Sequence, residues 1–111
     1  MNISDRIRQW NIDRGLLDNG FDPKLESRLL TEELEEFNDA KAWDEQVDAI
    51  CDLMVISIGS LWKMGIDPDK AMEEVLREIE SRSGKLDENG KFQKILTGEE
   101  YKADYSKCVL R

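Results

Sequence analysis

Two pairs of acidic residues stand among apolar residues at helical spacing. Glu33 and Glu36 are three residues apart. Asp48 and Asp52 are four apart, so each pair projects from one face of a helix. The apolar residues predicted on the same faces are Leu29, Leu30, Phe37 and Ala40 for the first pair, and Cys51, Val55, Gly59 and Trp62 for the second. Because desolvating a charge is costly and no basic residue stands at i±3 or i±4, the pattern predicts a bound cation.

Carboxylate oxygens suit a hard divalent cation, so we expect Mg²⁺ at this site, with Mn²⁺ as the other candidate. Two antiparallel helices joined by a short loop would bring the two acidic faces together. The predicted metal ligands are Glu33, Glu36, Asp48 and Asp52. The alternative interpretation is that these runs are solvated helix faces. Glu32 and Glu35 fit that interpretation, but the inward positions predicted for the two pairs favour the metal site.

The elements that must carry these residues are helices, and the predicted fold class is all-α. Asp22-Pro23 is typical of an N-cap followed by the first helical residue, and Gly65 is a C-cap signal. An Asn-Gly turn within residues 85–96 favours a small hairpin. The helices are predicted over residues 4–17, with Ser4 as cap, and over residues 23–42, 45–64 and 69–83.

Composition narrows the class of protein. The 111 residues suffice for one domain, which we expect to span residues 1–111. The net charge of −9 argues against nucleic acid or an anionic membrane as a partner. The chain has no histidine, which excludes His-based catalysis and His metal sites. Two cysteines far apart in sequence indicate a reduced compartment, and we expect a cytoplasmic protein without a membrane span.

The helix predicted over residues 45–64 is apolar around most of its circumference. Such a helix needs neighbours on nearly every side. Four helices of this size cannot easily cover it, so we expect a homo-oligomer, either a dimer or a tetramer. On its apolar arc, Cys51 is predicted to be a small core residue.

Several further residues have two interpretations each. Arg14, Arg82 and Lys85 are either solvated surface charges or phosphate-binding groups. Trp10 is either a core residue or a platform on which a base could stack. The sequence alone leaves both interpretations open for all four residues.

The segments E-E-L-E-E-F and V-D-A-I-C-D-L-M-V-I resemble the paired acidic motifs of MazG-like nucleoside triphosphate pyrophosphohydrolases. The family pattern is E-x-x-E, a spacer, then E-x-x-D. Glu33 and Glu36 match the first half, and Asp52 matches the final Asp. Ala49 stands where the family has Glu, and either Asp48 or Glu45 could substitute for it. The resemblance extends to W-x-x-x-R, formed by Trp10 and Arg14, to M-G-I-D, and to Lys85 before D-E-N-G-K.

The resemblance implies a four-helix-bundle fold, assembled as a dimer or tetramer, that hydrolyses a nucleoside triphosphate to the monophosphate and pyrophosphate with Mg²⁺. Glu33, Glu36 and Asp52 would then be catalytic, and a spare carboxylate, Glu36 or Glu45, would accept a proton from water. The residues expected to bind the nucleotide are Lys85, Arg82, Arg14 and Trp10. The alternative is a non-catalytic helical oligomer that binds nucleotides or a protein, an alternative supported by Ala49.

Overall fold

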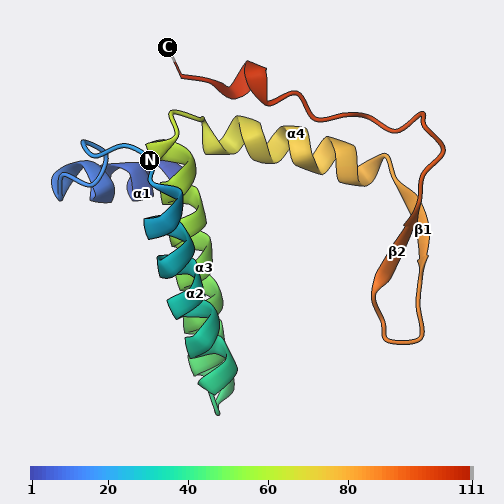
Figure 1. Cartoon of the computed structure of the whole chain (residues 1–111), viewed down its shortest axis with the longest axis horizontal. Coiled ribbons are helices and arrows are strands. Elements are labelled where there is room, and N and C mark those ends of the chain that lie inside the picture. Colours follow the sequence, from blue (N-terminus) through green and yellow to red (C-terminus); the bar gives the residue numbers. More distant parts are fainter. Residues whose placement is uncertain (111) are drawn as a thin grey trace. The chain divides into compact units, whose positions relative to one another are not determined.

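The computed structural model describes residues 1–110 of the chain, which are mostly helical (Figure 1). The elements are α1 (Ile3–Asp13), α2 (Pro23–Asp39), α3 (Trp43–Lys63), α4 (Pro68–Glu80), β1 (Ser83–Leu86), β2 (Phe92–Ile95) and a 3₁₀ turn, η1 (Tyr105–Cys108). They form two compact units, residues 1–68 and the residues from Asp69 on. The four predicted helices and the hairpin are confirmed, and the two short strands make the fold mostly rather than purely helical.

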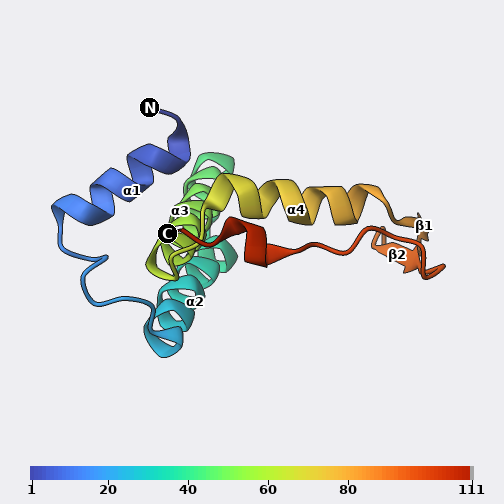
Figure 2. The same ribbon diagram turned by 90° about the horizontal axis from the view of Figure 1, so that it is seen from above.

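The first unit is built on a hairpin of two long helices. α2 and α3 are joined by a three-residue connection and lie side by side in opposite directions (Figures 1 and 2). The predicted start of α2 is confirmed, because the Asp22 side chain accepts a hydrogen bond from the Lys24 N–H at 3.1 Å and Pro23 follows as the first helical residue. The hairpin sets the acidic residues of one helix against those of the other.

Helix α1 packs against α3. The Trp62 Nε1–H of α3 donates to the Ser4 carbonyl of α1 at 2.9 Å. Near this contact, a Cβ at Gly59 would lie 3.3 Å from Asn11 Nδ2, so the absence of a side chain at Gly59 permits the close approach. The indole of Trp62 and the amide of Asn11 are both buried at this crossing.

Both ends of α1 differ from prediction. Its N-cap is Asn2, whose side chain accepts from the Asp5 N–H at 2.8 Å, while Ser4 is buried inside the helix. The helix ends at Asp13 rather than Leu17, because Gly15 adopts a φ of 70° and its N–H returns to the Ile12 carbonyl. The ends of the other helices lie within three residues of their predicted positions.

The second unit is a helix with a chain segment returning along it. After α4, strands β1 and β2 pair antiparallel, with Gly84 opposite Lys94. The C-terminal segment then hydrogen-bonds to two glutamates of α4. The donors to Glu74 are the Tyr101 hydroxyl at 2.6 Å and the Asp104 N–H at 2.9 Å, and the donor to Glu78 is the Ala103 N–H at 3.0 Å.

Several apolar side chains of α3 are exposed in the single chain. Gly59 and Trp62 are buried as predicted, but Cys51 and Val55 are exposed, so the prediction that Cys51 is a core residue is wrong for one copy of the chain. The physical reason is that α2 and α1 cover only part of the circumference of α3.

Across residues 1–110, the structure contains no helix with the length and apolar character needed to cross a membrane.

Candidate metal centre

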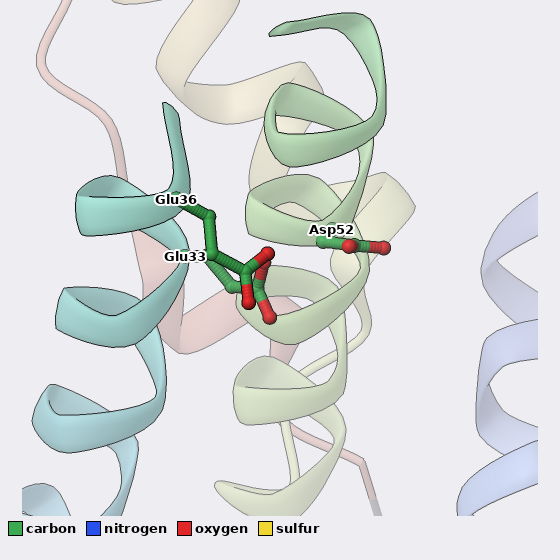
Figure 3. Close-up of side chains that lie close together, drawn as sticks. All are labelled: Glu33, Glu36 and Asp52. Atoms are coloured by element: carbon green, nitrogen blue, oxygen red, sulfur yellow. The ribbon is translucent and has the colours of Figure 1, made fainter. Parts of the chain in front are cut away.

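Three carboxylates from two helices meet at the seam of the α2–α3 hairpin. Glu33 and Glu36 leave α2 toward α3, which carries Asp52 (Figure 3). One ligand oxygen from each residue lies within 4.8 Å of the other two. The spacing of three residues on α2 places both glutamates on one side of the helix, and the antiparallel partner brings Asp52 to the same level. The structure thus brings together the three acids that match the family motif.

The electrostatic environment of this cluster favours neutralising its negative charge with a proton or a cation. Burial, a hydrogen bond to Glu36 and the charges of Glu36 and Asp52 together raise the pKa of Glu33 to about 7. Burial, followed by the charges of Asp48 and Glu36, raises the pKa of Asp52. Within residues 1–110, the Glu33 Oε2 atom is buried without a hydrogen-bond partner. Crowded oxygen ligands with one atom unsatisfied suit a hard divalent cation, so the residues present fit a metal ion.

The predicted inward position of all four acids is only partly correct. Glu33 and Asp52 are partly buried, but Glu36 and Asp48 are exposed in the single chain. Asp48 also lies outside the group of three, because its position on α3 is a full turn before Asp52, toward the end of the hairpin. Its role as a metal ligand remains a prediction.

Beside this cluster, an acidic hollow of about 510 Å³ lies at the closed end of the hairpin. Its lining residues are Glu36, Asp39, Ala40, Asp44, Glu45 and Asp48. Both candidates to replace the family glutamate, Asp48 and Glu45, therefore face the hollow that Glu36 shares. Ala49 itself is only 2% exposed, packed inside the first unit. The structure keeps both alternatives close to the cluster.

Trp10 and Arg14 form a stacked pair at the end of α1. The Arg14 guanidinium carbon lies 4.3 Å from the centroid of a Trp10 ring, and Arg14 Nη1 donates to the Trp10 carbonyl at 3.2 Å. Trp10 is half exposed, whereas Trp62 is the tryptophan of the core. The indole of Trp10 also borders a cavity together with Leu29 of α2 and Val55 of α3.

The other two predicted phosphate-binding residues belong to the second unit. Arg82 Nη2 lies 2.7 Å from Glu78 Oε2, so its charge is already paired. Lys85 is exposed on β1, where it is paired in register with Gln93. Their contribution to phosphate binding remains a prediction.

Sequence reasoning missed one buried charged pair. Lys63 Nζ, at the end of α3, lies 2.7 Å from Glu26 Oε1, in the first turns of α2. Local spacing could not reveal this pair, because 37 positions separate the two residues. The sequence did indicate that Glu26 faces α3, because Glu26 precedes Glu33 by seven residues and therefore lies on the same face of α2.

Comparison with known proteins gives the class of this molecule. Residues 13–79 match the family model described as phosphoribosyl-ATP pyrophosphohydrolase. The match covers more than half of the chain and includes both acidic pairs. The chain therefore belongs to the phosphoribosyl-ATP pyrophosphohydrolase family, a member of the all-α NTP pyrophosphatase (MazG-like) superfamily. No curated protein sequence matches the chain.

Family membership makes the chain a pyrophosphohydrolase, a hydrolase that acts on phosphoric anhydride bonds. This confirms the predicted resemblance and the predicted class of enzyme. It also weighs against the non-catalytic oligomer that the departure at Ala49 had suggested. The matched range contains Arg14 but excludes Trp10, Arg82 and Lys85.

Proposed function

We propose that this chain hydrolyses phosphoribosyl-ATP, releasing pyrophosphate, with Mg²⁺ held by Glu33, Glu36 and Asp52. The family description supports this substrate over the general nucleoside triphosphate that the motif alone predicted. The single observation that carries the proposal is the cluster of three carboxylates, whose ligand oxygens lie within 4.8 Å of one another. Such a cluster is stable only when a proton or a cation offsets its charge.

The reaction is the attack of water on the α-phosphorus. A bond forms from the water oxygen to that phosphorus, the bond to the bridging oxygen breaks, and pyrophosphate leaves. When bound, Mg²⁺ would neutralise phosphate charge and lower the pKa of the attacking water. Glu33 and Glu36 from α2 and Asp52 from α3 would hold the ion, and either Asp48 or Glu45 would complete the ligand set. Glu36 or Glu45 accepts the proton that the water loses.

Binding the phosphates is the task of cationic side chains. In the first unit, Arg14 stacks on Trp10, whose indole lines the cavity next to the cluster. Lys85 and Arg82 of the second unit remain predicted phosphate-binding residues. The net charge of −9 makes these cations and the metal ion necessary for holding an anionic substrate.

The test is pyrophosphate release from phosphoribosyl-ATP and from a panel of NTPs and dNTPs, with and without Mg²⁺. We expect phosphoribosyl-ATP to be the preferred substrate. Glu36→Gln and Asp52→Asn should each lower kcat/KM by about 10²-fold or more, because each removes a ligand or a base. Glu35→Gln, an exposed acid on the same helix, is the matched control and should retain full activity.

Two results would contradict the proposal. One is Mg²⁺-dependent hydrolysis of ordinary NTPs with no activity on phosphoribosyl-ATP, which would restore the general substrate. The other is full activity in Asp52→Asn and Glu36→Gln, which would move the reaction away from the α2–α3 seam.

A further inference from the structure

The buried pair of Glu26 and Lys63 has an unused hydrogen-bonding group. The two side chains are only 4% and 8% exposed. Lys63 lies against Glu26 Oε1, whereas Glu26 Oε2 is buried without a hydrogen-bond donor from any described residue. A buried carboxylate oxygen without a donor costs free energy. A ligand that brings a donor to this oxygen would therefore bind favourably.

Both charged residues line a cavity of about 360 Å³ between α1, α2 and α3. Its other walls are mainly apolar and include Trp10, Leu29 and Val55. Ligand sites in proteins have volumes of about 300–1,000 Å³, with apolar walls and a few convergent polar groups. The cavity has this composition, with an aromatic ring in one wall and one acceptor beside one cation.

The cavity adjoins the acidic cluster. Leu29 precedes Glu33 by one helical turn on α2, and Val55 follows Asp52 by one turn on α3. From Glu33, the α2 axis runs about 10 Å back to Glu26. A nucleotide whose phosphates lie at the cluster can therefore extend along the seam, so that its base reaches the buried pair.

We propose that this cavity receives the adenine ring of the substrate and that Glu26 and Lys63 select it. The Glu26 Oε2 atom accepts a hydrogen bond from the 6-amino group, and the Lys63 ammonium group donates to the neighbouring N7. Adenine presents the 6-amino donor beside the N7 acceptor, whereas a 6-oxo purine presents two acceptors, O6 and N7. Trp10 stacks on the ring without distinguishing between purines. The inference rests on the proposed function, because it assigns the base end of the same substrate.

A buried ion pair can also have a purely structural role, since it fixes how two helices pack. The two roles differ in what they predict for ligands. A structural pair affects stability and leaves the preference between purines unchanged. A selecting pair controls that preference even in a variant that folds as well as the original chain.

The experiment compares binding of AMP and IMP to the full chain with Mg²⁺ by calorimetry. AMP should bind about 10- to 100-fold more tightly than IMP. Glu26→Gln should reduce this ratio at least tenfold, because its amide can donate to the 6-oxo group. The double variant Glu26→Met and Lys63→Met replaces both charges with apolar groups of similar length, which preserves packing, and should abolish the preference.

Three further variants locate the site. Val55→Phe should weaken AMP binding at least tenfold by filling the cavity. Trp10→Leu should weaken AMP and IMP equally, since stacking tolerates either ring. Glu32→Gln, an exposed acid on α2, is the control and should change neither affinity.

Equal affinities for AMP and IMP in the original chain would overturn the proposal. So would an unchanged preference in a folded double variant. Failure of the proposed function is distinguishable, because AMP selectivity would then persist while no pyrophosphate is released from phosphoribosyl-ATP. Conversely, normal hydrolysis with an unchanged AMP-to-IMP ratio in the double variant would reject the base site alone.

Discussion

The Glu33 carboxyl group in the folded chain keeps its proton to a higher pH than an ordinary glutamate does. Its pKa is about 7, against an ordinary value of 4.5, because of burial and the neighbouring acids Glu36 and Asp52. Between these pH values the folded state binds more protons than the unfolded state, so the free energy of unfolding falls as pH rises. The same sign holds for Asp52, whose pKa is also raised.

We therefore predict that the metal-free protein loses stability as pH increases from about 4.5 to about 7. Urea unfolding in EDTA across this range measures the effect. Glu33→Gln should remove most of the slope and stabilise the metal-free chain at pH 7.5. Saturating Mg²⁺ should reverse the trend, because the cation replaces the proton. A flat profile in EDTA would mean that the cluster does not bind protons as inferred.

Acids with lowered pKa values do not mask this effect. Hydrogen bonds, from Tyr101 to Glu74 and from Gln93 to Asp87, hold the pKa of each of these two carboxyls below its ordinary value. Their contribution to stability is complete above the ordinary pKa of each acid and is lost as pH falls through the lowered value. The two effects thus occupy different pH windows.

Among the elements, α1 depends on a small residue for its place beside α3. Gly59 leaves room for Asn11, whose Nδ2 donates to the Ile7 carbonyl at 2.8 Å. We predict that Gly59→Val lowers the free energy of unfolding by about 1–3 kcal/mol, because the added methyl groups would collide with Asn11. Ser57→Val, at an exposed position of the same helix, is the control for β-branching. Equal losses in the two variants would show that the crossing tolerates a side chain.

The C-terminal segment depends on α4 through hydrogen bonds to its glutamates. Tyr101→Phe removes the hydroxyl that donates to Glu74, and should speed amide hydrogen exchange at Ala103 and Asp104 by about 3- to 10-fold. Tyr105→Phe removes an exposed hydroxyl and should leave exchange unchanged. If Tyr101→Phe has no effect, the backbone bonds to Glu74 and Glu78 suffice by themselves.

At the level of the whole molecule, the first unit leaves many apolar side chains uncovered. The large exposed ones on α2 and α3 are Leu34, Trp43, Val47, Ile50, Met54 and Val55. An exposed apolar surface of this kind is typical of an interface with another protein. This exposure supports the prediction of a homo-oligomer that the apolar circumference of α3 suggested.

We predict a dimer or tetramer in light scattering after size-exclusion chromatography, with a Tm that increases with protein concentration. Val47→Glu and Met54→Glu should shift the chain toward monomer, because they would bury a charge between copies. Lys41→Glu, at an exposed polar position, should leave the mass unchanged. A monomer at all concentrations would contradict the prediction.

The sequence by itself determined the parts of this protein that depend on local spacing. The Asp22-Pro23 start of α2, the turn at Gly65 and the Asn-Gly hairpin follow from backbone preferences within a few residues. Helical periodicity also placed Glu33 and Glu36 together on α2, and two helices with a short connection had to bring them to α3.

Only the tertiary structure decided how deeply each acid is buried and what faces it across the seam. Glu36 and Asp48 are exposed and line a hollow at the closed end of the hairpin, which no helical wheel describes. The register between α2 and α3 set Glu26 against Lys63 and enclosed a cavity beside the acidic cluster. Registers of this kind arise from packing between residues distant in sequence, so they are fixed when the helices meet rather than when each one forms.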